Sequence, residues 1–183
     1  MLFRTFSPPA LAVSLMLGVA ATAEAASSCL GGPSTTLRLA GPAIATPKTF
    51  TPASLAAYPP SKVTVSYFSG ASGMVTKTFV GVPLYDLIQA AGLVVDANRK
   101  NDKLRKYLAA TATDCYQAIL SYAEIDPGYG GQQAMVAYAT VDATGTQTPL
   151  DDTEGAMKLV IPGDKFGGRQ VFHLESLTAR SAP

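Results

Sequence analysis

The chain has 183 residues, of which 15% are charged and 48% are apolar, and its formal net charge at pH 7 is +1. The charged share lies below the ~25% that is usual in soluble proteins, and so small a net charge argues against nucleic acid or an anionic membrane as a partner. Domains typically have about 100–150 residues, so we expect a single domain over residues 26–183.

Residues 1–25 have the features of a cleavable secretory signal peptide. Arg4 is the only charge before Glu24, residues 10–22 are apolar or small, and Ala23-Glu24-Ala25 suits signal peptidase. The apolar run is shorter than the roughly 20 residues that a bilayer core requires. We therefore expect a periplasmic or secreted mature chain that has no membrane span.

Two cysteines, Cys29 and Cys115, remain after this cleavage. An oxidising compartment allows such a pair to form a disulfide. A metal or redox pair is disfavoured, because CxxC spacing and further soft ligands are missing. The sequence leaves open whether the two Cβ atoms come close enough to pair.

Helix signals occur at a few places along the mature chain. Thr51 is a suitable cap for a short helix that has Pro52 in its first turn. Apolar residues at helical spacing predict a second helix over residues 84–91, which ends at Gly92.

The basic run 98–106 predicts a solvated helical turn, with a binding patch as the alternative. Shorter features are a helical turn at 123–127, ended by Pro127, and a flexible loop at 128–131.

The remaining segments predict a sheet-rich fold. Alternating apolar residues and an enrichment in β-branched and aromatic residues indicate several short strands, which do not alternate regularly with helices. This order indicates an α+β fold with β-rich mixed sheets and two or three short helices, rather than a doubly wound fold. The predicted strands cover residues 36–39, 62–68, 74–80, 107–113, 116–120, 134–141, 157–161 and 169–177.

The usual catalytic constellations are missing from the sequence. His173 is the only histidine, which excludes a histidine-rich zinc or iron site. Its place in a predicted strand, on one face with Val171, favours a core or surface histidine. No nucleophile elbow, Walker loop or dinucleotide fingerprint occurs. Asp151, Asp152 and Glu154 form an acidic turn without the EF-hand pattern, which favours a solvated turn over a calcium site.

Six short segments occur in a characteristic order over most of the mature chain. They are residues 79–88 (FVGVPLYDLI), 114–116 (DCY), 135–138 (MVAY), 149–150 (PL), 159–163 (LVIPG) and 168–171 (GRQV). In this order the segments resemble the molybdopterin-binding oxidoreductase domain of the sulfite oxidase superfamily, in a small stand-alone version. The resemblance implies a sulfite-oxidase-like fold, and it implies molybdopterin as the cofactor of the family.

The metal ligand of that family has no counterpart in this chain. Family members bind molybdenum through a cysteine thiolate, twelve residues before the glycine that corresponds to Gly81; counting back reaches Ser69. A neutral hydroxyl is a much poorer ligand than a thiolate, although a serine alkoxide would retain a ligand at this place. Neither Cys29 nor Cys115 lies near this position in the sequence.

A second departure lies near the C-terminus, where family members often have Arg-x-Val-Lys-Trp and use its basic groups to hold the anionic pterin. Here Arg169-Gln170-Val171 is followed by Phe172, an apolar residue in the lysine position. Arg169 retains the planar fork that suits phosphate or carboxylate, and a surface salt bridge is the alternative interpretation. Lys165 is a candidate for the replacement charge.

The start of the chain is a third departure. Enzymes with this cofactor are generally folded in the cytoplasm and exported by the twin-arginine route, which requires paired arginines. This chain has Arg4-Thr5 at the corresponding place. A chain that crosses the membrane unfolded cannot carry a preinserted pterin.

These departures lead to one main hypothesis and two alternatives. The main hypothesis is an exported module that binds a small ligand or a periplasmic protein partner and lacks molybdenum catalysis. One alternative is a molybdopterin-dependent oxidoreductase loaded after export, with Ser69 or solvent in place of the thiolate. The other is a non-catalytic subunit of a periplasmic redox complex, with residues 99–106 as the contact. The candidate binding residues of the cleft are Tyr67, Phe68, Ser69, Lys165 and Arg169, with no catalytic or metal residue assigned.

Overall fold

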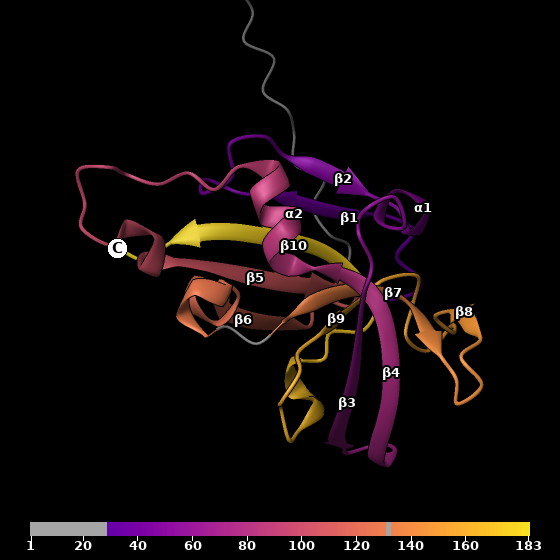
Figure 1. Ribbon diagram of the computed structural model, residues 1–183. Coiled ribbons are helices and arrows are strands. Elements are labelled where there is room, and N and C mark those ends of the chain that lie inside the picture. The colour runs from indigo at the N-terminus through magenta and orange to yellow at the C-terminus, as the bar shows by residue number, and fades with distance from the viewer. Residues whose placement is uncertain (1–28, 131–132) are drawn as a thin grey trace, which may run out of the picture.

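Two five-stranded sheets make up most of the structure, a computed structural model that describes residues 29–130 and 133–183 (Figure 1). In spatial order, the first sheet contains β2 (Lys48–Phe50), β1 (Leu37–Ala40), β10 (Leu174–Ser181), β5 (Lys106–Ala112) and β6 (Gln117–Ser121). The second sheet contains β3 (Ser61–Ser69), β4 (Gly73–Pro83), β7 (Met135–Val141) and β8 (Gln147–Pro149), and β9 (Lys158–Val160) also pairs with β7. The predicted signal peptide, residues 1–25, lies outside the described residues.

The strand connections give the first sheet mixed directions. β1 and β10 pair in parallel, with Leu39 opposite Leu177, whereas the other neighbouring strands are antiparallel. In the second sheet β3 and β4 form a long hairpin that projects away from the rest of the fold (Figure 1). The predicted α+β class, rich in sheet and with few helices, is confirmed.

Both predicted α-helices are present. In α1 (Pro52–Leu55), the Thr51 hydroxyl accepts a hydrogen bond from the Ser54 backbone, and the Ser54 hydroxyl accepts one from the Thr51 backbone. In α2 (Leu84–Ala91) the residues predicted to face the core are fully buried, and they pack in one cluster with residues of β1, β5 and β10. Gly92 ends α2 at φ +77°, a conformation that favours glycine.

The strand predicted at residues 169–177 is wrong in its first half. Residues Gly167–Arg169 form a short 3₁₀ helix, η4, and β10 begins only at Leu174. His173 has φ +46°, so it and Val171 do not share one face of a strand. Backbone hydrogen bonds impose this turn, because His173 donates to Glu154 and accepts from Thr113. Alternation of residue types gives no indication of such long-range bonds.

The segment before β7 also differs from the prediction. Pro127 begins a second 3₁₀ turn, η3 (Pro127–Tyr129), instead of ending the preceding one, η2 (Tyr122–Glu124). The Asp126 carboxylate caps η3 by accepting from the Gly128 backbone at 2.8 Å, so residues 128 and 129 are part of a helical turn rather than a flexible loop. The three-residue strands β2 and β8 were not predicted, since three residues carry too little periodicity.

A disulfide joins Cys29 to Cys115 across 86 residues of sequence. Cys115 lies in the turn between β5 and β6, so the bond fixes the segment before β1 against the far side of the first sheet. Two hydrogen bonds support the attachment: the Gly31 backbone donates to the Thr113 carbonyl, and the Thr113 hydroxyl donates to the Gly32 carbonyl at 2.7 Å. The two cysteines thus form the disulfide that the sequence left open, and this bond agrees with an oxidising compartment. In the described ranges, no helix combines the length and apolar character needed to cross a membrane.

Removing this disulfide should destabilise the fold. The double substitution Cys29→Ser and Cys115→Ser frees a long loop in the unfolded chain, so we expect the free energy of unfolding to fall by about 2–5 kcal/mol. Urea unfolding followed by circular dichroism, with and without reductant, measures the change. Reductant should destabilise the unsubstituted protein and leave the double variant unaffected. Equal stability of the two proteins under oxidising conditions would contradict this account.

Candidate functional site

An open pocket of about 460 Å³ lies at the outer end of β3, and we call it the Ser69 pocket. Tyr67, Phe68 and Ser69 enter it from the end of β3 and η4 contributes its glycines, because the two segments lie side by side. The Phe68 backbone donates to the Lys165 carbonyl at 2.9 Å, and Phe68 forms a parallel bridge with Phe166. The lining residues are Tyr67, Phe68, Ser69, Gly70, Phe166, Gly167, Gly168 and Phe172.

Aromatic rings dominate the walls of the Ser69 pocket. The rings of Phe68 and Phe166 meet edge to face with centroids 6.5 Å apart, and Phe166 is 71% exposed. Gly167 leaves room for the Tyr67 ring, since a Cβ there would lie only 3.0 Å from two ring carbons. The pocket is therefore suited to apolar or planar groups and offers few polar contacts.

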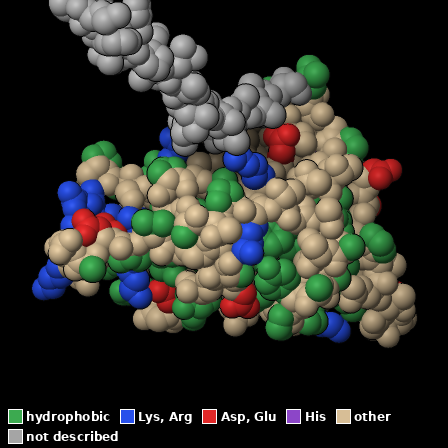
Figure 2. Space-filling view, turned by 90° about the horizontal axis from the view of Figure 1, so that it is seen from above, with side chains coloured by type: hydrophobic (Ala, Val, Ile, Leu, Met, Phe, Trp, Pro, Cys, Tyr) green, Lys and Arg blue, Asp and Glu red, His purple; other side chains and the backbone are tan. Residues whose placement is uncertain are grey.

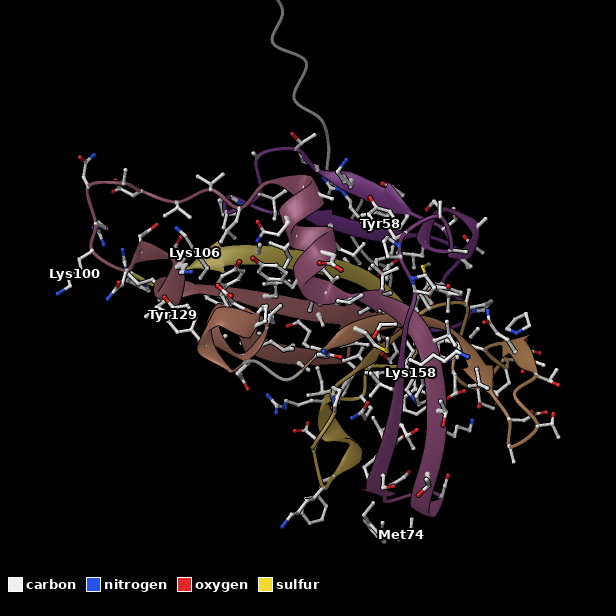
Figure 3. All side chains as sticks on the ribbon, viewed as in Figure 1. Tyr58, Met74, Lys100, Lys106, Tyr129 and Lys158 are labelled. Atoms are coloured by element: carbon white, nitrogen blue, oxygen red, sulfur yellow. A yellow bond between two sulfur atoms is a disulfide. The ribbon has the colours of Figure 1, made fainter. Side chains whose placement is uncertain are left out.

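A fully buried lysine, Lys158 (Figure 3), contacts two residues that line this pocket, Tyr67 and Phe172. Its ammonium is 2.8 Å from a carboxylate oxygen of Glu154 and 3.2 Å from the Tyr67 hydroxyl. It also lies 3.9 Å from the centroid of the Phe172 ring and 4.7 Å from that of Phe79. A charge removed from water persists only when it is paired, and the carboxylate and the rings supply that pairing. Lys158 therefore fixes the positions of Tyr67 and Phe172, which both line the pocket.

Glu154 connects the buried lysine to the surface. Its second oxygen accepts from Lys77 at 3.0 Å, and Lys77 is also 3.7 Å from Asp151. Burial lowers the pKa of Lys77, but the hydrogen bond and charge of Glu154 together with Asp151 raise it above the ordinary value. Asp151 accepts from the Thr153 hydroxyl and the Glu154 backbone, so the predicted acidic turn is ordered, and Asp151 and Asp152 in it are exposed to solvent. Among the described residues no cluster suits a metal ion.

Arg169 lies on η4 but its side chain is held away from the Ser69 pocket. Its guanidinium makes two hydrogen bonds to Asp164, of 2.9 and 2.6 Å, and a third to Glu124 at 2.6 Å. These bonds raise the pKa of Arg169 above its ordinary value. Burial raises the pKa of Glu124, but the bonds from Arg169 and Ser121 lower it below the usual range. Arg169 therefore forms salt bridges with Asp164 and Glu124, which is the alternative interpretation that the sequence allowed. Together with Glu124, it lines a different pocket.

Lys165 contributes its backbone to the site, because its carbonyl bonds to β3, while the residue itself is exposed. Of the five predicted cleft residues, Tyr67, Phe68 and Ser69 thus lie together in one pocket. Lys165 flanks that pocket and Arg169 is bound elsewhere.

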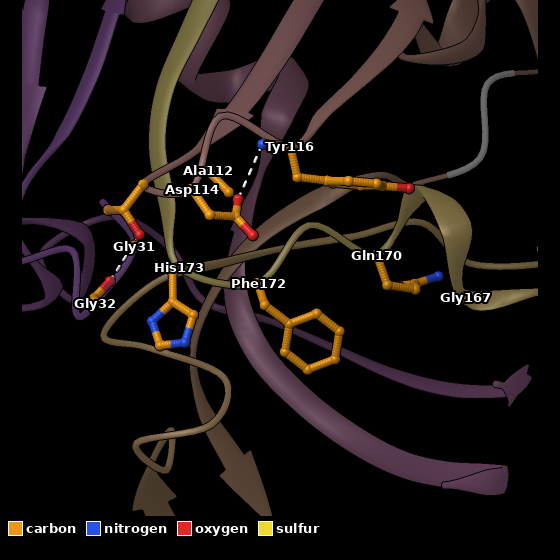
Figure 4. A pocket seen from close by; sticks show the side chains of 10 residues that line it. Gly31, Gly32, Ala112, Asp114, Tyr116, Gly167, Gln170, Phe172 and His173 are labelled. Atoms are coloured by element: carbon orange, nitrogen blue, oxygen red, sulfur yellow. Dashed lines mark hydrogen bonds between the residues drawn. The ribbon is translucent and has the colours of Figure 1, made fainter. Parts of the chain in front are cut away.

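A second pocket, of about 320 Å³, lies on the other side of η4, and we call it the His173 pocket (Figure 4). It shares Gly167 and Phe172 with the Ser69 pocket. The disulfide-bound segment, the β5–β6 turn and the turn before β10 form its walls. The lining residues are Gly31, Gly32, Ala112, Thr113, Asp114, Tyr116, Gly167, Gln170, Phe172 and His173.

Sequence reasoning missed Lys158, the ion pair that Glu154 forms with it, and the His173 pocket as a whole. Lys158 and Glu154 are four residues apart, a spacing that suggests an ion pair only in a helix, and here they lie in a turn and a strand. The shape of the His173 pocket depends on a left-handed turn at His173. The alternation of residue types predicted a strand there and so gave no sign of the turn. The one usable signal was the match at residues 114–116, which marked the β5–β6 turn as a characteristic segment.

The residues at these pockets do not fit the molybdenum and pterin group that the family resemblance implies. Both cysteines of the chain are consumed in the disulfide, so no thiolate is available as a ligand. Ser69 is the residue at the expected place, and the guanidinium of Arg169 is already bound by two carboxylates. The described residues around the pocket thus lack the soft ligand, and the arginine at the expected place is not free to hold an anionic cofactor.

Comparisons with known proteins support the fold. No family model matches the chain, and no curated protein matches it. Among solved structures 23 chains match. One of them is the sulfane dehydrogenase SoxCD from Paracoccus pantotrophus, with a TM-score of 0.62 and 19% identity, over 80% of this chain and 38% of that chain.

At this identity the likeness shows the fold alone, and this chain spans well under half the length of its neighbour. Structure and comparison together define an α+β, sheet-rich domain with a sulfite-oxidase-like fold. The fold that the ordered segments implied is therefore confirmed.

Replacing Glu154 and replacing Lys158 should lower the free energy of unfolding by unequal amounts. Glu154→Gln leaves the Lys158 ammonium buried without a carboxylate, so we expect a loss of about 3–5 kcal/mol in unfolding free energy. Lys158→Met removes the buried charge while Glu154 keeps Lys77, so the loss should be smaller, about 1–2 kcal/mol. Urea unfolding of both variants, with the disulfide intact, gives the comparison. Equal losses, or a larger loss for Lys158→Met, would show that the pair does not have this role.

Proposed function

We propose that this chain is an exported binding module which has retained a molybdopterin-oxidoreductase-like fold and has lost molybdenum catalysis. It binds a small ligand or a periplasmic partner in the cleft around η4, formed by the Ser69 and His173 pockets. Tyr67, Phe68 and Ser69 form one wall of this cleft, and the Lys165 backbone holds that wall in place.

The observation that carries the proposal is the use of both thiols in the Cys29–Cys115 disulfide. Molybdenum in the related family requires a cysteine thiolate from the protein, and this chain has no third cysteine to supply one. The serine at the expected position offers a neutral hydroxyl, which is a poor ligand for a soft site.

The state of Arg169 supports the same conclusion. An anionic pterin would have to compete with Asp164 and Glu124 for the guanidinium, and these carboxylates already make three charge-assisted hydrogen bonds to it. Releasing Arg169 would also leave Asp164 without this partner. The cleft therefore favours a ligand that does not rely on the guanidinium of Arg169.

Export agrees with a function that needs no cofactor loading in the cytoplasm. The first residues lack the paired arginines of the twin-arginine route, and a disulfide requires an oxidising compartment. A chain that folds after export meets no cytoplasmic supply of the pterin.

The basic segment is a weak candidate for a contact with a redox partner. Asp102, at the start of η1 (Asp102–Arg105), is buried and pairs with Lys106 at 2.8 Å and with Arg105 at 3.5 Å. Lys103 pairs with Asp126 at 3.1 Å. Basic and acidic side chains lie next to one another at this end of the molecule (Figure 2). The positive charges are thus largely compensated within the chain, which leaves little net field to attract a partner.

Metal and pterin analysis of exported protein tests the proposal. Protein produced with its own signal, in a bacterial host that makes the cofactor, should contain only traces of molybdenum and pterin by elemental analysis and fluorescence. One molybdenum per chain in the unsubstituted protein would overturn the proposal.

The matched variant is Ser69→Cys, which restores a thiolate at the expected position. Molybdenum in this variant alone would identify the missing thiolate as the cause of the loss. If neither protein contains molybdenum, a second barrier explains the result, because the Arg169 guanidinium is bound by Asp164 and Glu124 and cannot hold the pterin. Equal and stoichiometric loading of both proteins is the result that the proposal forbids.

A further inference from the structure

The His173 pocket is preformed, and its wall is held by covalent and hydrogen bonds. The disulfide fixes Gly31 and Gly32 against the β5–β6 turn, and the Thr113 hydroxyl donates to Gly32 at 2.7 Å. On the opposite side, the Tyr116 hydroxyl donates to the Gly168 carbonyl and so links the turn to η4. A pocket with fixed walls loses little entropy when it binds a ligand.

Two residues at this pocket have backbone conformations that non-glycine residues rarely adopt. Cys115 has φ +66° and His173 has φ +46°, both in the left-handed region. Such strain persists where the surrounding structure enforces it, and it is concentrated at ligand sites. Here it turns the chain sharply on both sides of the pocket, so that Asp114, Tyr116, Phe172 and His173 surround one space (Figure 4).

Most polar groups on the walls already have partners inside the protein. The side-chain amide of Gln170 donates to and accepts from the backbone of Ile161, and the Thr113 hydroxyl is bound to Gly32. One carboxylate oxygen of Asp114 accepts from the Tyr116 backbone at 2.9 Å. The other oxygen has no recorded partner in the part of the chain that the structure describes, so it is available to a ligand.

The charge at the pocket is negative. Asp114 is the only charged residue that lines it, and neither Lys nor Arg occurs among the described lining residues. Lys158 lies behind the Phe172 ring, but Glu154 compensates its charge at 2.8 Å. Tyr116 and Phe172 add aromatic surface, which attracts cations through the electron-rich faces of the rings.

From this arrangement we infer that the His173 pocket binds a small organic cation with an apolar or aromatic body. The cationic group bonds to the free oxygen of Asp114, and the body packs between the Tyr116 and Phe172 rings and the glycine wall. The inference names a ligand class for the binding module and so rests on the proposed function. It also distinguishes this pocket from one for an anionic pterin, which Asp114 would repel.

The test compares three probes of similar shape, benzylamine, benzyl alcohol and benzoate, on the mature chain with its disulfide intact. Titration followed by nuclear magnetic resonance should show saturable binding of benzylamine below about 20 mM, a range usual for a ligand of this size. Benzoate should bind at least about fivefold more weakly. The signals that shift should include those of Asp114, Tyr116 and His173.

Asp114→Asn tests the role of the carboxylate. Asparagine keeps an oxygen for the Tyr116 backbone, so the turn should stay folded, as circular dichroism can verify. We expect benzylamine to bind about three- to tenfold more weakly, with benzyl alcohol changed less than about twofold. Asp152→Asn, which removes the same charge from an exposed turn outside the pocket lining, is the matched control and should leave all three probes unchanged.

The inference is overturned if benzylamine shows no saturable binding in this range, if benzoate binds as well as benzylamine, or if Asp114→Asn leaves benzylamine unaffected. None of these results changes the molybdenum and pterin content that the metal analysis measures. Conversely, stoichiometric molybdenum in the unsubstituted protein would refute the proposed function without any probe being measured. The two failures are therefore distinguishable.

Discussion

The disulfide between Cys29 and Cys115 is the constraint on which the stability of the fold and the wall of the His173 pocket both depend. It closes 86 residues into a loop and holds the segment before β1 against the β5–β6 turn, so one bond both stabilises the fold and builds a wall of the His173 pocket. It also consumes the only two thiols of the chain. Structural stability and the absence of a soft metal ligand thus have the same cause.

A second constraint acts on the opposite side of η4, where the buried Lys158 binds Glu154 and contacts the rings of Tyr67 and Phe172. These rings line the two pockets, so the buried charge determines the shape of the cleft although it faces no solvent. The nearby Arg169 is held by carboxylates as well. Lys158 and Arg169 are therefore engaged inside the protein, and Asp114 is the charged residue that lines the His173 pocket.

The sequence predicted the sheet-rich class, both α-helices and the two strands that form the β3–β4 hairpin, because local periodicity and capping residues determine those elements. It also indicated that Phe68 and Ser69 lie at a cleft, through the order of its segments. It failed at His173, where long-range backbone bonds impose a left-handed turn, and at Lys158, whose partners are distant in sequence. These features arise from tertiary packing, for which neither composition nor spacing gives a signal.

The central claim is that the folded protein has no free thiolate to offer a metal. Its most direct test is alkylation of the protein, purified from its own compartment without reductant and then unfolded, followed by mass spectrometry. The account predicts that neither Cys29 nor Cys115 is labelled, and that both are labelled after reduction. Labelling of either cysteine before reduction would contradict it.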